Sequence, residues 1–187
     1  FLYNKSRHGF FYKDDIWFFL PNLKKIYNKN DIKNFEKIDY LEIKLNKKYN
    51  IKSKIDSGML GLGWTHASYG RTISNSGVWS EGYISSMLFK KSELTQINTI
   101  ILNFEKFLNV KNKPLIVDIL INDVYFETLN LKEKEDLNII LKTKKSYFVN
   151  GINVIDFKIK NPVTPMSKFE SVDGRLLGFL IKTLEFK

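Results

Sequence analysis

Hydrophobic and polar residues alternate along most of this chain after residue 37. In residues 153–161, "NVIDFKIKN", Ile155, Phe157 and Ile159 share one side and the residues between them are polar. Such an alternation predicts a strand with one buried face. The same period predicts further strands at 38–45, 83–89, 97–104, 115–123, 124–131 and 137–143, and 176–186 also has the composition of a strand.

Turn signals separate these segments. Asn122–Asp123 lies between two strand patterns and predicts a hairpin turn, and Asn150–Gly151 predicts a second turn. Pro162 and Pro165 interrupt the chain before the last strand, and no long helical pattern follows residue 35. Short strands joined by turns predict an all-β fold, an antiparallel β-sandwich or jelly roll.

Residues 1–35 have a different pattern. Aromatic residues cluster there without strand alternation, and Asp14 and Asp15 predict the start of a short helix that runs through Phe19 and ends at Pro21. We interpret 1–35 as a short, partly helical extension or connector from a preceding domain, and 36–187 as the sandwich domain. Because the first residue is Phe, we expect the chain to be part of a longer polypeptide.

Composition limits the classes of site. The chain has 187 residues, 43% of them hydrophobic, which is enough for one packed core. No apolar run reaches the roughly 18 residues of a membrane-spanning helix, and no signal-peptide pattern is present. The absence of cysteine excludes disulfides, thiolate metal sites and a cysteine nucleophile.

The formal net charge of +10 raises the question of an anionic partner. Lys47, Lys48, Lys52 and Lys54 surround Tyr49, which loosely matches a surface for single-stranded nucleic acid. Lysines of this kind usually protect strand edges and keep a sheet soluble. We therefore interpret the charge as mainly compositional and predict no nucleic-acid partner.

Residues for catalysis are sparse. The chain has only two histidines, His8 and His66, and no G-x-S-x-G motif. Glu81 and Asp173 could form a pair of carboxylates, but Arg175 follows Asp173 by two residues and favours an ion pair instead. No catalytic residue is predicted, and the chain by itself is not expected to be an enzyme.

No cofactor is predicted, and a structural calcium ion stays open as an alternative. Hard cations prefer oxygen ligands, which Asp56, Asp173 and backbone carbonyls in sandwich loops could provide. No EF-hand spacing is present, and two distant histidines do not favour a zinc site.

The stretch 61–82, "GLGWTHASYGRTISNSGVWSEG", is the strongest candidate for binding. Sugars present apolar faces to aromatic rings and hydroxyls to polar side chains, and this stretch combines both kinds of residue. The candidates are Trp64, His66, Tyr69, Arg71, Trp79 and Glu81. The alternative is that each tryptophan is a core residue whose N–H donates to a carbonyl.

Three segments resemble a known family. They are 61–89, "GLGWTHASYGRTISNSGVWSEGYISSMLF", 115–131, "LIVDILINDVYFETLNL", and 149–186, "VNGINVIDFKIKNPVTPMSKFESVDGRLLGFLIKTLEF". In order and spacing they resemble a C-terminal β-sandwich domain appended to bacterial enzymes that make or modify cell-surface polysaccharides, such as glycosyltransferases. The resemblance covers 36–187. One departure is "HASYGRTISNS", which is longer than the usual link between the two Trp motifs.

The resemblance implies a non-catalytic domain similar to carbohydrate-binding modules. It adds Asp173 and Arg175 to the candidate site, with Arg175 pairing with Asp173 or Glu81 and lying over a Trp ring. It implies a glycan partner and a preceding catalytic domain in the same polypeptide. It also implies a role in capsule or lipopolysaccharide biosynthesis, in the cytoplasm at the inner-membrane face and close to the membrane.

Two other functions stay open. One is a structural or oligomerisation module, which would bury an apolar strip of Phe10, Phe11, Trp17 and Phe18 against another domain or chain. The other is a hydrolase or acyltransferase that acts on glycans. A binding module should instead expose Trp64 or Trp79 beside carboxylates or amides, and an enzyme should pair a perturbed titratable group with a second one.

Overall fold

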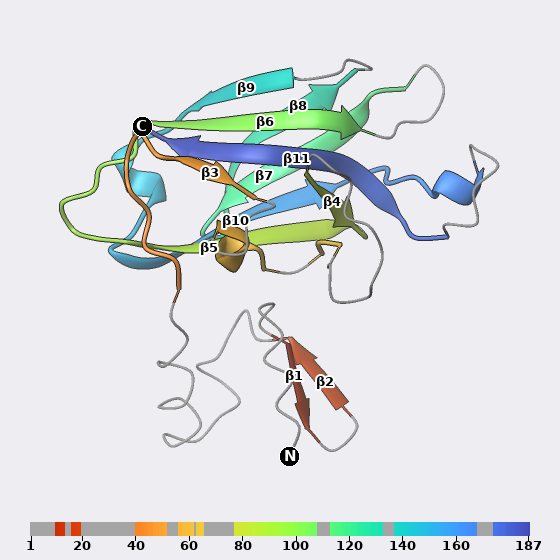
Figure 1. The fold of residues 1–187 in the computed structure, drawn as a ribbon, viewed down its shortest axis with the longest axis horizontal. Coiled ribbons are helices and arrows are strands. Elements are labelled where there is room, and N and C mark those ends of the chain that lie inside the picture. The colour runs from red at the N-terminus through yellow and green to blue at the C-terminus, as the bar shows by residue number, and fades with distance from the viewer. Residues whose placement is uncertain are drawn as a thin grey trace.

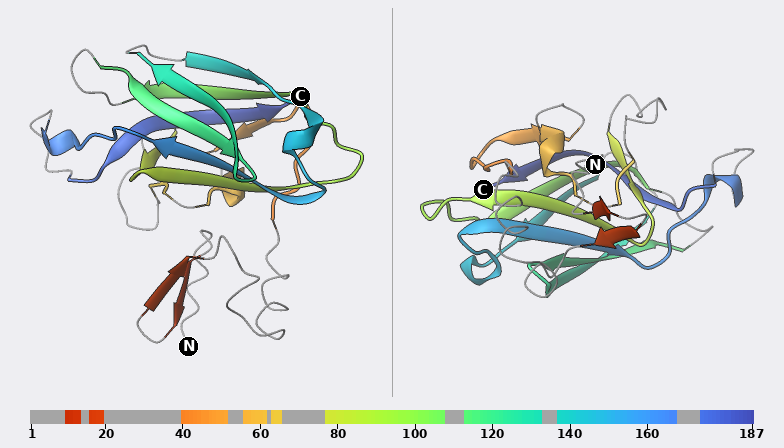
Figure 2. Two further views of the ribbon diagram at one scale, coloured as in Figure 1. Left: turned by 180° about the vertical axis from the view of Figure 1, so that it is seen from behind. Right: turned by 90° about the horizontal axis from the view of Figure 1, so that it is seen from below.

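In the described residues from Tyr40 onwards, two antiparallel sheets pack face to face (Figure 1). The structure is a computed structural model, which describes residues 10–13, 16–19, 40–51, 56–61, 63–65, 77–107, 113–132, 137–167 and 174–187. One sheet has four strands in the order β5 (Ile84–Lys91), β10 (Gly151–Ile159), β7 (Leu115–Ile121) and β8 (Val124–Leu131). Figure 2 (left) shows this sheet from behind.

The other sheet has five strands. Four of them follow the order β3 (Lys48–Asn50), β11 (Leu177–Phe186), β6 (Thr99–Phe107) and β9 (Leu137–Lys142), and β4 (Val78–Glu81) also pairs with β11. Short 3-10 helices lie at η2 (Asp56–Met59), η4 (Lys145–Tyr147) and η5 (Pro165–Ser167). The predicted all-β sandwich is confirmed.

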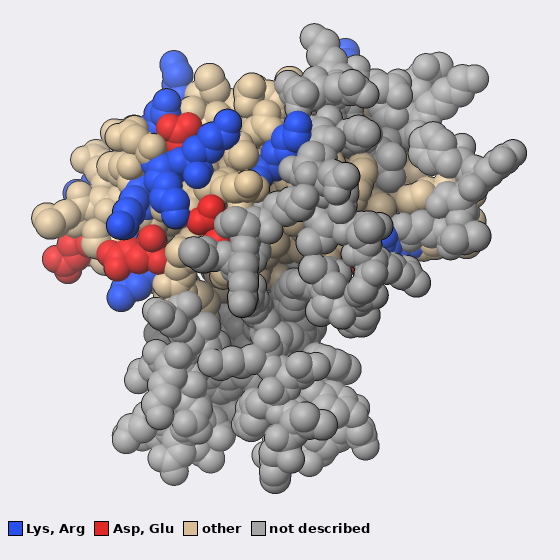
Figure 3. Space-filling view, viewed as in Figure 1, with Lys and Arg blue, Asp and Glu red and all other residues tan. Residues whose placement is uncertain are grey.

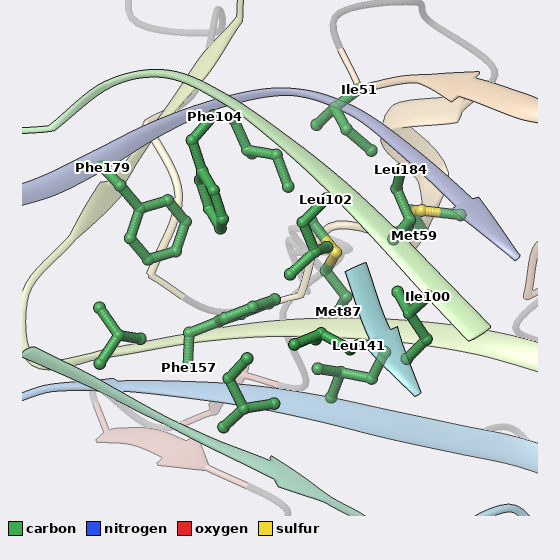
Figure 4. Packing of buried hydrophobic residues seen from close by; sticks show 14 of the residues in the cluster. Ile51, Met59, Met87, Ile100, Leu102, Phe104, Leu141, Phe157, Phe179 and Leu184 are labelled. Atoms are coloured by element: carbon green, nitrogen blue, oxygen red, sulfur yellow. The ribbon is translucent and has the colours of Figure 1, made fainter. Parts of the chain in front are cut away.

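The core fills the space between the sheets with the residues that alternation predicted. Ile155, Phe157 and Ile159 of β10 are buried. Phe157 packs on Phe179 of β11 with ring centroids 5.4 Å apart, and Phe104 of β6 lies 4.9 Å from Phe179 (Figure 4). Edge-to-face pairs of this kind add about 0.5–1.5 kcal/mol each beyond the burial of their surface.

The hairpin predicted at Asn122–Asp123 is confirmed. Their φ angles are 51° and 66°, the left-handed pair that a two-residue type I′ turn requires. The Asn122 side chain also accepts a hydrogen bond from the Val154 amide and donates to the Asn153 side chain, both at 2.9 Å. The turn between β7 and β8 is thereby tied to β10.

The strand predicted at 38–45 is wrong for the residues described from Tyr40 onwards. These residues contact β5 through a single parallel bridge, Glu42 to Lys90, although Ile43 is buried as its alternation predicts. The outer edge of β5 is shared, because Leu60 bridges to Met87 on the same strand. The segments that contain Glu42 and Leu60 therefore each pair with part of the β5 edge, along which the predicted strand would have paired continuously.

The helix predicted through Phe19 is also wrong. Phe10–Lys13 (β1) and Ile16–Phe19 (β2) pair as antiparallel strands, with Phe10 opposite Phe19. Aromatic residues dominate both segments and favour a pleated strand, and this preference outweighs the helix-start signal of Asp14 and Asp15. The aromatic strip named for the docking alternative lies on this hairpin.

Candidate functional site

Trp64 lies in the core between the sheets. Its side chain is 3% exposed, and its Nε1 donates a 2.7 Å hydrogen bond to the Ser86 carbonyl. The rings of Phe157 and Phe179 meet it edge to face, with centroids 6.1 Å and 5.8 Å away. A ring enclosed in this way has no face for a sugar, so Trp64 has a structural role in place of the predicted ligand contact.

The backbone beside Trp64 holds β4 against β5. The Gly63 carbonyl accepts hydrogen bonds from the Glu81 amide and the Ser85 hydroxyl, both at 2.6 Å. Thr65 binds Trp79 twice, because its amide donates to the Trp79 carbonyl at 2.9 Å and its hydroxyl accepts from the Trp79 amide at 3.2 Å. The segment around Gly63 therefore fixes the position of β4.

The β4 strand turns Trp79 and Glu81 away from the core. Val78 and Ser80 are buried, whereas Trp79 and Glu81 are half-buried on the opposite side of the strand. The register places Trp79 opposite Leu180 of β11, which is fully buried. Trp79 and Leu180 share the outer face of the five-stranded sheet, since cross-strand partners lie on one face.

Glu81 is paired with Arg175, as one of the two predicted alternatives requires. The Arg175 guanidinium lies 4.0 Å from the Glu81 carboxylate, and the two side chains are 32% and 39% exposed. The Gly82 amide also donates to the Leu176 carbonyl at 2.8 Å, which brings the two segments together. An ion pair this exposed contributes about 0–1 kcal/mol to stability. Because both side chains are partly exposed, a ligand can reach them.

Tyr83 is a further exposed aromatic residue close to Glu81 in the sequence, and the sequence analysis did not single it out. Its side chain is 60% exposed, two residues after Glu81. The sequence signal that could have identified it is its place directly after Gly82. In the structure, Gly82 has a φ angle of 81°, and the chain leaves β4 there. We call Trp79, Glu81 and Arg175 the β4 site.

The other predicted site residues cannot be placed. His66, Tyr69, Arg71 and Asp173 lie outside the described residues. Their contacts with a glycan, and the pairing of Asp173 with Arg175, stay predictions.

The calcium alternative does not fit Asp56. One oxygen of this carboxylate lies 3.0 Å from the Lys47 ammonium, and the other accepts a hydrogen bond from the Asn50 amide at 2.9 Å. Within the described ranges, no group of three or more His, Asp or Glu side chains could hold a metal ion. Asp56 instead ties η2 to β3.

Two carboxyl groups on the outer face of the four-stranded sheet have pKa values shifted in opposite directions. Hydrogen bonds from Lys160 and Thr128 hold the pKa of Asp118 below its ordinary value. Burial raises the pKa of Asp156, although the Ser86 hydroxyl donates to it at 2.5 Å. The described hydrogen-bond partner of Asp156 is thus a hydroxyl and not a second titratable group, so this geometry is not that of an acid–base pair.

These shifts predict opposite pH dependences for two matched variants. The Asp118 carboxylate stabilises the fold above its ordinary pKa of 3.8, and this contribution disappears as the pH falls through its lower native value. The native state favours protonated Asp156, so that contribution is present below 3.8 and is lost as the pH rises through its higher native value. We expect Asp118→Asn to lower the melting temperature at pH 7 and Asp156→Asn to raise it.

Thermal unfolding from pH 7 to pH 3 measures both effects. Both differences from the unsubstituted chain should shrink toward the acid end, because the carboxyl groups become neutral like the amides that replace them. Shifts of the same sign at pH 7 would contradict this assignment.

Comparisons with known proteins give structural matches only. No family model and no curated protein matches the chain. Among solved structures, the carbohydrate-binding module CBM36 in complex with calcium and xylotriose has a TM-score of 0.38 at 15% identity, over 79% of this chain and 93% of its own. A family 35 carbohydrate-binding module from an environmental isolate has a TM-score of 0.37 at 13% identity, over 75% of this chain and 92% of its own.

A third similar structure is a larger protein. It is a Paenibacillus sp. cycloisomaltooligosaccharide glucanotransferase complexed with cycloisomaltoheptaose, with a TM-score of 0.34 at 7% identity, over 78% of this chain and 19% of its own. The β-sandwich assigned to this chain rests on its own strand pairing. In the part of the chain that the structure describes, no helix is long and apolar enough to cross a bilayer.

Proposed function

We propose that this sandwich is a non-catalytic carbohydrate-binding module whose ligand contacts the β4 site. The observation that carries the proposal is the placement of Trp79 and Glu81 on the outer side of β4, with Arg175 paired to Glu81. The site combines an aromatic ring with a carboxylate and a guanidinium. These are groups that can contact the apolar face and the hydroxyls of a sugar.

The geometry suits the two surfaces of a sugar ring. Trp79 and Glu81 are two positions apart on one strand, which separates them by about 7 Å. The indole can cover the apolar face of a sugar while the Glu81 carboxylate accepts from its hydroxyls and Arg175 donates to them. Because β4 is held by Thr65, Gly63 and β11, the site lies on a rigid strand, which favours a defined binding geometry.

The test is a glycan array probed with the 187-residue chain, followed by calorimetry with a glycan that binds. We expect Trp79→Ala to weaken binding at least about tenfold, since a stacked aromatic residue is a typical hot spot. The matched control is Tyr125→Ala, which removes an aromatic side chain that is 58% exposed on β8 of the other sheet.

Circular dichroism should show that both variants are folded. Equal losses of affinity in both variants would contradict a specific β4 site. A chain that binds no glycan on the array would favour the docking alternative.

For the wider context, we propose that the domain belongs to a bacterial enzyme of capsule or lipopolysaccharide biosynthesis, located in the cytoplasm at the inner-membrane face. There it would hold the glycan acceptor near a catalytic domain and raise its local concentration. The resemblance of 61–89 and 149–186 supports this proposal. The test is the full-length polypeptide: a nucleotide-sugar-binding catalytic domain would support it, and an unrelated neighbour would contradict it.

A further inference from the structure

The outer face of the five-stranded sheet carries a row of uncharged polar side chains beyond the β4 site. The register aligns four residues on four adjacent strands, namely Asn50 on β3, Thr183 on β11, Asn103 on β6 and Asn138 on β9. The Asn103 amide donates a 2.9 Å hydrogen bond to the Asn138 side chain. With about 4.8 Å between neighbouring strands, the row spans about 14 Å across the sheet.

Positive charge flanks this row. Lys48, in the neighbouring row on β3, and Lys142, at the end of β9, are both exposed. The register places Glu185 opposite Lys48, and Lys187 lies 3.3 Å from the Glu185 carboxylate and balances its charge. Figure 3 shows Lys and Arg side chains on this face of the molecule, with Asp and Glu side chains beside them.

The polar row and the β4 site lie along one strand. Trp79 faces Leu180, and the residues opposite β3 are Thr183 to Glu185 on the same strand, β11. Figure 1 shows β4 and β3 beside β11. Five strand residues cover about 17 Å, which is the length of a short oligosaccharide. Over this length the outer face presents first an aromatic ring, then side-chain amides, and then lysines.

From this arrangement we infer that the outer face of the five-stranded sheet binds an extended polysaccharide strand that carries carboxylate or phosphate groups. This inference rests on the proposed function and adds to it the charge of the ligand and a second contact surface. The side-chain amides and the Thr183 hydroxyl donate to and accept from sugar hydroxyls, and Lys48 and Lys142 attract the anionic groups.

The side chains next to Lys48 favour an anionic glycan over a nucleic acid at this face. Sites for single-stranded nucleic acid interleave lysines with aromatic rings on which bases stack. On this sheet the register places Ile101 and Ile140 between Lys48 and the far edge, with Ile140 63% exposed. In the row that contains Lys48, the described part of the face therefore has aliphatic side chains where bases would need rings, and Trp79 lies farther along β11.

The experiment compares three polymers and a single-stranded oligonucleotide on the 187-residue chain by biolayer interferometry at two salt concentrations. Polygalacturonate carries carboxylates, poly(glycerol phosphate) carries phosphates, and fully methyl-esterified polygalacturonate is the neutral counterpart of the first. The test variant is Lys48→Gln with Lys142→Gln. The matched control is Lys90→Gln with Lys132→Gln, which removes one exposed charge from β5 of the other sheet and one directly after β8.

We expect the test variant to bind at least one anionic polymer about tenfold more weakly, with the effect decreasing at high salt. The control variant should change affinity less than about twofold. Whichever anionic polymer binds more tightly identifies the charged group as carboxylate or phosphate.

Several results would overturn the inference. They are equal losses in the test and control variants, equal affinity for neutral and anionic polymers, and tighter binding of a single-stranded oligonucleotide through the same lysines. If Trp79→Ala weakens glycan binding but the lysine substitutions do not, the proposed function holds and this inference fails. If binding depends on the lysines but is unchanged in Trp79→Ala, the outer sheet face is the binding surface and the β4 site is not.

Discussion

Gly63→Ala is expected to prevent stable folding. A Cβ atom at this position would lie 1.9 Å from the Ile84 carbonyl oxygen and 3.0 Å from that of Glu81, and the φ angle of Gly63 is +68°. Backbone atoms cannot move aside without breaking the hydrogen bonds of Gly63 to Glu81 and Ser85. We expect a loss of more than about 4 kcal/mol in the free energy of unfolding, a large part of the stability of an ordinary domain.

Two other glycines provide graded controls. Gly82 has a φ angle of +81° but nothing within 4 Å of an added Cβ, so Gly82→Ala should cost only about 1 kcal/mol through backbone strain. Gly58 has neither constraint, and Gly58→Ala should change stability by less than about 0.5 kcal/mol. Urea denaturation of the three variants gives the order. A loss of stability in Gly63→Ala no larger than in Gly82→Ala would contradict this role of Gly63.

Trp64→Ala is expected to be the second most destabilising change. It leaves a large cavity beside Phe157 and Phe179, and such truncations cost about 3–5 kcal/mol. Trp64→Phe keeps most of the ring but removes the N–H that binds the Ser86 carbonyl. That carbonyl still accepts a 2.7 Å hydrogen bond from the Gly61 amide, so we expect the smaller cost of one lost hydrogen bond, about 0.5–1.5 kcal/mol. Chemical denaturation measures both losses.

The same variants separate a structural tryptophan from a binding one. Below its melting temperature, Trp64→Phe should bind the array-selected glycan as tightly as the unsubstituted chain, because the ring lies in the core. Loss of glycan affinity with unchanged stability in Trp64→Phe would reverse the assignment and make Trp64 the ligand contact.

The strands of the sandwich could be predicted because each presents one face to the core. β7 and β10 follow the alternation closely, with Val117, Ile119 and Phe157 fully buried. Alternation was not sufficient at Leu41 and Ile43, because the pattern says which side is apolar but not whether a partner strand is available. It also missed β3 and β4, which are too short to show a period and exist because β11 offers them an edge.

The candidate site was predicted as a group of residue types within one stretch of sequence. Trp64 and Trp79 are close in the sequence, and the prediction therefore put them in one site. In the structure the two rings lie on different sides of the five-stranded sheet. Thr65 connects them, because it pairs with Trp79 on β4 directly after the chain leaves the core. Tyr83 was missed because its exposure depends on the turn at Gly82.

The sequence by itself determined that the fold is an all-β sandwich, that cysteine chemistry is absent, and that aromatic and polar residues concentrate between Gly61 and Gly82. These are local properties, set by the two-residue period of a strand and by composition. Only the tertiary structure decided which tryptophan is buried, that Arg175 reaches Glu81, and that Asn50, Thr183, Asn103 and Asn138 form one row. The reason is physical: burial and pairing depend on strands far apart in the chain, whose register no local pattern records.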